Sequence, residues 1–369
     1  MEQSLTFKKN KRFSQAVIDS QIYQIAIINQ LGDIISTNFS WKHFCKENNG
    51  NIEKCDIGNN YFTMSPSEIA KGIKDVLSGK LNIFSYEYPC HSPLEIRWFN
   101  MDVTPLIVNE ESRKIDGAVI THKNITERKL LELSLQKDLK LAKSIQESIL
   151  VPALQEEEIK IEGLYLPSEY LSGDMYAWFK IDKHLYGVIL LDIMGHGVSS
   201  SLISMSMRSL LPGIITRVTD PVKVYNELNK HFYSLFRTLN SQRLYFCTGI
   251  YLLIDTKKQK INYLNAGHPS GVVLSRNKDQ FLDNRVPPIG LMESPKVSSG
   301  EVKYSKNDRV ILYTDGIFDS MDMNLKNFEN FLLNTGKTKY QHYSLSEIST
   351  IIKNNINQKD DISILSIQL

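Results

Sequence analysis

The sequence contains few cysteines, and none of them are spaced for a metal site. The four cysteines lie far apart, at Cys45, Cys55, Cys90 and Cys247, and no Cys-x-x-Cys pair occurs. This spacing excludes the usual patterns of structural zinc sites. We therefore expect free thiols, as in a reducing cytoplasm.

Long apolar runs and a strong net charge are also absent. The longest uninterrupted apolar runs have the length of a strand, far below the ~20 residues that cross a bilayer. Residues 1–15 are polar and basic, without the apolar core of a secretion signal. The net charge is only +2, and no basic stripe of the kind that binds nucleic acid is present. We predict a cytoplasmic protein with no membrane segment and no nucleic-acid partner.

The length of 369 residues suggests two or three domains. Within the first third, strand-like runs at residues 22–28 and 34–36 are followed by helical patterns up to residue 77. Three further strand-like runs complete this region, at residues 84–88, 97–104 and 115–122. The order is thus two strands, helices and three strands in about 100 residues.

Residues 126–150 contain no glycine or proline and are rich in Leu, Lys and Glu. Six positions recur there at spacings of three and four, all apolar or small except for one glutamine: Leu131, Leu135, Leu139, Ala142, Gln146 and Ile149. This pattern predicts a coiled-coil seam. An amphipathic helix packed on the following domain is the alternative, and the two can hold at different ends of the same helix.

Aspartates stand beside strand-like runs at four places in the rest of the chain: Asp174, Asp192, Asp315 and the pair Asp360-Asp361. A single aspartate next to glycine is usually a turn residue. Four of them at strand ends predict a shared site, in which the carboxylates would repel one another strongly unless cations neutralise them.

Mg²⁺ and Mn²⁺ are the cations that carboxylate oxygens favour. Two such ions lower the pKa of a water molecule and hold the oxygens of a phosphoryl group. The pattern therefore favours hydrolysis of a phosphate ester by water, and no cysteine nucleophile stands in a phosphate-binding loop.

Four motifs carry a family resemblance: Asp192-Ile193-Met194-Gly195-His196-Gly197, Asn265-Ala266-Gly267-His268-Pro269, Tyr313-Thr314-Asp315-Gly316 and Asp360-Asp361-Ile362-Ser363. Together they resemble the PPM/PP2C serine/threonine phosphatases, in their bacterial SpoIIE/RsbU branch. That resemblance implies a β-sandwich flanked by helices.

The first third resembles a PAS sensor domain, most clearly in its exit motif, Asn124-Ile125-Thr126-Glu127-Arg128-Lys129. The expected fold is therefore α+β in three parts. Residues 1–125 form a PAS domain whose ligand is unknown, residues 126–150 a helical coiled-coil connector, and residues 151–369 a PP2C-like αββα sandwich.

The resemblance also implies roles for individual residues. Asp192 would bridge two Mn²⁺ or Mg²⁺ ions, and the carbonyl of Ile193 would bind one of them. Asp192, Asp315 and Asp360 are the implied catalytic residues. The implied metal ligands are Asp174, Asp192, Ile193, Asp315, Asp360 and Asp361, with Asp360 preferred over Asp361.

The chain departs from the branch at one position near Asp174. The usual Gly-Gly-Asp-Tyr-Tyr-Asp reads Ser172-Gly173-Asp174-Met175-Tyr176-Ala177 here, so the second aspartate is missing. His196 and His268 are expected to support the site rather than bind the ions, because such sites favour oxygen ligands.

The implied function is a sensor-regulated phosphatase for phosphoserine or phosphothreonine in proteins. The implied substrate is a STAS-type anti-anti-sigma factor of a stress response, and we expect a homodimer formed through the PAS domain and connector. Two alternatives remain: a phosphatase for another phosphoprotein, and a non-catalytic sensor scaffold.

Overall fold

A computed structural model describes residues 12–109, 111, 114–238, 245–276, 278–321, 323–335, 350 and 358–369. The chain divides into two compact units, Met1–Gln136 and Lys137–Leu369. Each unit is described by itself. The predicted domain limits at residues 125 and 150 remain predictions.

The first unit is built on a five-stranded antiparallel sheet with the strand order β2-β1-β5-β4-β3. Its strands are β1 (Gln24–Asn29), β2 (Ile34–Thr37), β3 (Phe84–Pro89), β4 (Trp98–Leu106) and β5 (Gly117–Asn124). Side chains alternate between two faces along a strand, and in β4 the buried positions are Phe99, Met101 and Val103. One face of this sheet therefore supplies the core of the unit.

Helices between β2 and β3 cover that face. They are α2 (Phe39–Glu47), α3 (Ile52–Cys55), the 3₁₀ helix η1 (Tyr61–Met64) and α4 (Ser67–Leu77). Helix α4 buries Ile69, Ile73, Val76 and Leu77, whose spacing places them on one side of a helix. They join Met101 and other sheet residues in one apolar cluster.

The long helix α5 (Thr126–Ser148) begins directly after β5. Thr126 fixes its start, because the Thr126 hydroxyl accepts a hydrogen bond from the Trp98 amide at 2.9 Å. Along its first half Leu131 and Leu135 are exposed, whereas Gln146 near its end is 4% exposed. Packing of the helix on the second unit is therefore seen at its end, and the coiled-coil seam along its first half stays a prediction.

The second unit contains two six-stranded sheets. In the first, the order is β14-β11-β10-β9-β8, with β15 also on β11; in the second it is β13-β12-β16-β17-β7-β6. The strands of the first sheet are β8 (Met175–Asp182), β9 (Leu185–Ile193), β10 (Cys247–Asp255), β11 (Lys260–Ala266), β14 (Arg285–Val286) and β15 (Gly300–Lys303). Those of the second are β6 (Leu154–Gln155), β7 (Lys160–Leu166), β12 (Gly271–Leu274), β13 (Gln280–Leu282), β16 (Arg309–Tyr313) and β17 (Ile362–Gln368).

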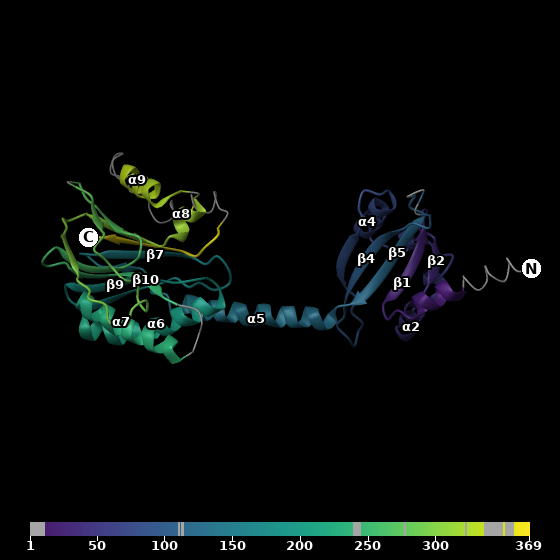
Figure 1. Cartoon of the computed structure of the whole chain (residues 1–369), viewed down its shortest axis with the longest axis horizontal. Helices are drawn as coiled ribbons and strands as arrows, with labels where there is room; N and C mark the ends of the chain where they lie inside the picture. The colour runs from purple at the N-terminus through teal and green to yellow at the C-terminus, as the bar shows by residue number, and fades with distance from the viewer. Residues whose placement is uncertain are drawn as a thin grey trace, which may run out of the picture. The chain divides into compact units, whose positions relative to one another are not determined.

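These sheets lie face to face between two layers of helices. Val188, Ile250, Leu312 and Leu365 belong to one apolar core that draws on both sheets. Helices α6 (Val198–Val218) and α7 (Pro221–Thr238) cover the outer face of the first sheet, and α8 (Gly316–Ser320) and α9 (Leu325–Thr335) lie on the side of the second (Figure 1). This is a mixed α+β sandwich with the expected αββα layering.

Helix α6 is the one described helix that is long and apolar enough to cross a membrane by length and composition. It contacts β8 and β9. On the side that faces the sheet, its own residues Ile203, Met207, Leu211 and Ile215 are buried in the apolar core. The core helix of a soluble protein passes the same test, so this helix is only weak support for a membrane span.

Candidate active site

Two of the predicted aspartates meet at one end of the first sheet. Asp174 immediately precedes β8, and Asp192 is the second-last residue of β9. The antiparallel register pairs Met175 with Leu191, so Asp174 and Asp192 lie at the same edge on neighbouring strands. Sequence adjacency to strand ends was therefore a sound signal for their proximity.

The strand on the other side of β9 contributes Thr248, which the register places opposite Asp192. The Thr248 hydroxyl donates to Asp192 Oδ2 at 3.4 Å and lies 2.9 Å from His268 Nδ1. His268 is 1% exposed, and burial lowers its pKa to about 3. His268 is thus a neutral group in contact with the threonine that donates to Asp192, and its supporting role stays a prediction.

Asp315 and the Asp360-Asp361 pair meet at one end of the second sheet. Asp315 follows β16 and the pair precedes β17, and the register aligns Tyr313 with Ile364. Gly316 permits the close approach of the two segments, because a Cβ there would lie 2.1 Å from the Asp361 carbonyl oxygen. Glycine is required at this position by space.

Two hydrogen bonds join the strand ends of the two sheets. The Thr314 hydroxyl, next to Asp315, donates to Asp174 Oδ2 at 2.8 Å. The Gly173 amide donates to Asp361 Oδ2 at 2.8 Å. All four predicted strand ends therefore gather at one edge of the sandwich.

The carboxylates at this edge perturb one another. Burial, followed by repulsion from Asp315 and Asp360, raises the pKa of Asp192 to about 7. Burial, followed by repulsion from Asp192 and Asp361, raises the pKa of Asp174 well above its ordinary value. Such mutual destabilisation of charge is what bound cations relieve.

Asp361 differs from Asp360 in how its oxygens are used. Asp361 Oδ1 accepts hydrogen bonds from the amide and hydroxyl of Ser168, at 2.7 and 2.9 Å, while Oδ2 accepts from Gly173. Asp361 thereby holds the loop that leads to Asp174. The side chain of Asp360 is half-buried, and its Oδ1 accepts from the Asp361 amide at 2.8 Å. Asp361 therefore has a structural task of its own, and the preference for Asp360 as a metal ligand stays a prediction.

The oxygen atoms at this edge fit hard divalent cations, since they come from aspartate carboxylates and from the nearby backbone carbonyl of Ile193. Gly173 lies against that carbonyl, because a Cβ there would come within 3.0 Å of the Ile193 oxygen. As they stand, however, no three His, Cys, Asp or Glu side chains among the described residues are arranged to hold an ion. The predicted ligands are gathered at one edge without forming a closed cage.

Two other positions complete the comparison with the sequence. His196 is exposed and its Nδ1 pairs with Glu169 Oε1 at 3.2 Å, so its partner is not one of the strand-end aspartates. Ala177, where the branch has a second aspartate, is fully buried in the apolar core beneath α6. No carboxylate reaches the site from this position.

The sequence pattern alone did not reveal the role of Gln146. The Gln146 amide nitrogen donates to the Ser172 carbonyl at 2.8 Å, and its oxygen accepts from the Ser172 amide at 3.1 Å. Helix α5 thereby holds the loop that carries Asp174. The available signal was a polar residue in an otherwise apolar seam.

Comparisons with known proteins agree with this geometry. The family description "Stage II sporulation protein E (SpoIIE)" matches residues 182–369, about half of the chain. "Phosphoserine phosphatase RsbP" from Bacillus subtilis (strain 168) is 41% identical over 189 residues, which are 51% of this chain and 47% of that protein. "Protein IcfG" from Synechocystis is 24% identical over 207 residues, or 50% of this chain and 33% of that protein.

The chain thus spans about half the length, or less, of these relatives. Among solved structures, the SiaA-PP2C domain of Pseudomonas aeruginosa shares the fold. Its TM-score is 0.54 at 21% identity, and the match covers 65% of this chain and 98% of that domain. With a family match over half of its length, the chain belongs to the SpoIIE family.

Proposed function

We propose that the second unit is a metal-dependent phosphatase that hydrolyses phosphoserine or phosphothreonine in a protein. One observation carries the proposal: aspartates from four strand ends gather at one edge of a SpoIIE-family sandwich and raise one another's pKa. The 41% identity to a phosphoserine phosphatase over this region supports the substrate class.

The chain's own residues prepare the site for this reaction. When bound, two Mn²⁺ or Mg²⁺ ions supply the positive charge that lowers the pKa of a water and stabilises phosphoryl oxygens. Asp192, Asp315 and Asp360 would hold them, with Asp174 and the Ile193 carbonyl. Thr248 and Thr314 fix the orientation of the Asp192 and Asp174 carboxylates through the hydrogen bonds described above.

Phosphate release from a phosphoserine protein tests the proposal. We expect release by the native chain with Mn²⁺, none after chelation, and a loss of at least roughly a hundredfold in Asp192→Ala and Asp315→Ala, because metal-centred steps carry most of the rate. Asp182→Asn is the control, since Asp182 also ends a strand of the first sheet but lies at the end of β8 away from Asp174 and Asp192. Full activity in Asp192→Ala would refute the assignment.

The substrate we propose is a phosphorylated STAS-type anti-anti-sigma factor, on the strength of the resemblance to the SpoIIE/RsbU branch. A panel of phosphorylated proteins from one cell, including STAS domains, tests this choice. We expect the highest kcat/KM for a STAS-type protein. A different phosphoprotein hydrolysed faster would retain the enzyme and replace the substrate.

The first unit is proposed to be a PAS sensor that regulates the phosphatase. The strand order β2-β1-β5-β4-β3, the helices between β2 and β3 and a cavity of about 270 Å³ support this proposal. Cys90 and His91, whose side chains are of the types that bind haem iron, are not among the residues that line the cavity. The ligand of the cavity stays unassigned.

A non-catalytic scaffold is the second candidate. It is favoured by the alanine at position 177 and by the lack of a ready three-ligand cluster in the described chain. A scaffold would not bind two Mn²⁺ ions in the second unit, so metal titration separates the two functions.

A further inference from the structure

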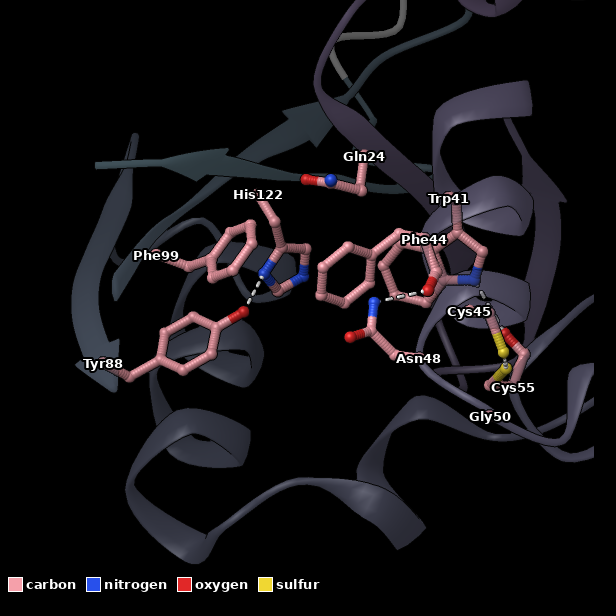
Figure 2. Close-up of a pocket in the computed structure, with 10 residues that line it drawn as sticks. All are labelled: Gln24, Trp41, Phe44, Cys45, Asn48, Gly50, Cys55, Tyr88, Phe99 and His122. Carbon is pink, nitrogen blue, oxygen red and sulfur yellow. Dashed lines mark hydrogen bonds between the residues drawn. The ribbon is translucent and has the colours of Figure 1, made fainter. Parts of the chain in front are cut away.

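The cavity in the first unit has a wall that contains two thiols. It lies between the sheet and the α2–α3 segment, and ten residues line it: Gln24, Trp41, Phe44, Cys45, Asn48, Gly50, Cys55, Tyr88, Phe99 and His122 (Figure 2). Five of these ten residues carry aromatic rings, counting the imidazole of His122, and the two cysteines lie together at one side of the cavity.

Cys45 and Cys55 come from different helices, yet their Sγ atoms are 2.9 Å apart. Cys45 lies in the last turn of α2, and Cys55 is the last residue of α3. The distance is shorter than ordinary van der Waals contact between two sulfur atoms, and a disulfide bond needs about 2.05 Å. A movement of roughly one ångström separates the pair from a bond.

Neighbouring residues keep the two thiols in this position. Gly50 lies against Cys45, because a Cβ there would be 2.6 Å from Cys45 Sγ. The Gly50 amide donates to the Cys45 carbonyl at 2.8 Å, and the Trp41 indole donates to the Cys55 carbonyl at 2.9 Å. The short loop between α2 and α3 is therefore folded back so that the sulfurs meet.

We propose that Cys45 and Cys55 are a redox modification site, which forms a reversible disulfide when the first unit meets a peroxide. Disulfides in a reducing compartment are mostly of the transient, redox-sensing kind. The proposal does not depend on the phosphatase activity of the second unit.

The reaction balances with hydrogen peroxide as the oxidant. The thiolate of Cys45 attacks one peroxide oxygen, the O–O bond breaks, and the sulfur becomes a sulfenic acid while the other oxygen leaves as water after protonation. The Cys55 sulfur then attacks the Cys45 sulfur and displaces a second water. Two thiols and one peroxide thus give one disulfide and two waters.

The order of the two cysteines follows from their surroundings. The pKa of the Cys55 thiol is raised to about 12, chiefly by burial. The neighbouring Cys45 and Asp56 add to the effect. Cys55 therefore retains its proton and is the poorer first nucleophile. We assign Cys45 as the sulfur that is oxidised first and Cys55 as the one that resolves it.

The disulfide would tie the end of α2 to the end of α3 and so fix one wall of the cavity. Because both sulfurs line the cavity, oxidation changes its lining from two thiols to one covalent bridge. Oxidation by peroxide and binding of a ligand in the cavity would then both act on the same wall of the first unit.

Mass spectrometry of the full chain tests the proposal. The reduced protein is titrated with hydrogen peroxide, unfolded in guanidinium chloride so that the buried Cys247 reacts as well, blocked with N-ethylmaleimide and digested with trypsin. Lys46 and Lys54 lie between the two cysteines, so trypsin separates them unless they are bonded. We expect the Cys45–Cys55 linked peptides, a fall from four blocked thiols to two, and recovery of four after dithiothreitol.

Variants test the order of the steps. In Cys55→Ser we expect a dimedone-trapped sulfenic acid at Cys45, and in Cys45→Ser none at Cys55 at the same peroxide dose. Cys90→Ser is the matched control and should form the bridge as the native chain does. Full blocking of Cys45 and Cys55 at a dose that already oxidises Cys90, or a bridge that includes Cys90 or a second chain, would overturn the proposal.

Discussion

Asp360 and Asp361 are neighbours in the chain, but at the residue scale they have different tasks. Asp361 accepts three hydrogen bonds from Ser168 and Gly173 at 4% exposure. We predict that Asp361→Asn lowers the free energy of unfolding of the second unit by about 3 kcal/mol, since hydrogen bonds to a charged group are strong and an amide group cannot accept them all. Urea unfolding followed by tryptophan fluorescence measures this.

Asp360→Asn provides the contrast. We predict a change in unfolding free energy within about 0.5 kcal/mol together with a loss of Mn²⁺ affinity greater than the roughly 10–100-fold that outer-shell changes cost. Calorimetry of metal binding measures the second effect. Exchanged phenotypes, with stability lost in Asp360→Asn and affinity lost only in Asp361→Asn, would reverse the assignment.

His122 in the first unit makes stability depend on pH. Its ring nitrogens lie 3.0 Å from the Tyr61 hydroxyl and 2.6 Å from that of Tyr88, and burial lowers its pKa to about 4. The unfolded chain, with an ordinary pKa near ~6.5, therefore binds more protons between these values. We therefore predict that the contribution of His122 to stability is complete above pH ~6.5 and declines by up to roughly 3 kcal/mol as the pH falls to about 4.

Hydrogen exchange of peptides from the first unit measures this loss across the pH range. In His122→Gln the decline between those pH values should be smaller, because the titrating ring is gone, whatever the effect of the substitution at neutral pH. An equal decline in both proteins would show that other groups cause it.

At the scale of single elements, α5 is tied to the site through Gln146. We predict that Gln146→Ala weakens Mn²⁺ binding by roughly tenfold, because the Ser172–Asp174 loop loses both hydrogen bonds that hold it. Ser144→Ala, at an exposed position on the same helix, is the control and should bind Mn²⁺ like the native chain. Equal affinities in all three would show that α5 does not position the loop.

Substitution of alanine for glycine should have opposite effects in helices α8 and α6. Gly316→Ala should lose Mn²⁺ affinity, because the new Cβ would lie 2.1 Å from the Asp361 carbonyl and push the two strand ends apart. Gly213 in α6 has open space around its Cβ position, so Gly213→Ala should raise the free energy of unfolding by roughly 0.5–1 kcal/mol. Metal calorimetry and urea unfolding of both variants check the pair.

The positions of helices could be predicted from the sequence better than the side chains that cap their N-terminal ends. An aspartate before a proline, as in Asp220-Pro221, is a pattern that predicts a helix start, and Asp220 Oδ1 accepts a hydrogen bond from the Lys223 amide at 3.0 Å. The comparable Ser65-Pro66 start has no side-chain cap, because the Ser65 hydroxyl donates to the Tyr61 carbonyl instead. Local pattern cannot distinguish these cases, since the competing partner comes from the tertiary fold.

At the scale of the whole molecule, the exposed half of α5 is the predicted dimer seam. We expect that the double change Leu131→Glu and Leu135→Glu converts a dimer into a monomer in sedimentation, since both leucines are exposed in the chain alone and like charges would face one another across the seam. Lys140→Glu, an exposed charge reversal on the same helix, should remain dimeric. A native chain that sediments as a monomer would contradict the seam.

The molecule also shows which long-range features the sequence could reveal. Aspartates at strand ends predicted the shared edge, because strand register carries them there. No periodic pattern in the sequence indicated the hydrogen bond from Thr314 to Asp174 or the contact of Cys45 with Cys55. Each joins segments whose approach is set by tertiary packing. Their detection required the three-dimensional structure.

The central claim is that four strand ends form one two-cation centre in the second unit. Calorimetric titration of the full chain with Mn²⁺ tests it most directly, in parallel with Asp192→Ala and the control Asp182→Asn. The account predicts two bound Mn²⁺ ions in the native chain and the control, with both sites lost or strongly weakened in Asp192→Ala. Absence of Mn²⁺ binding in the native chain, or unchanged binding in Asp192→Ala, would contradict it.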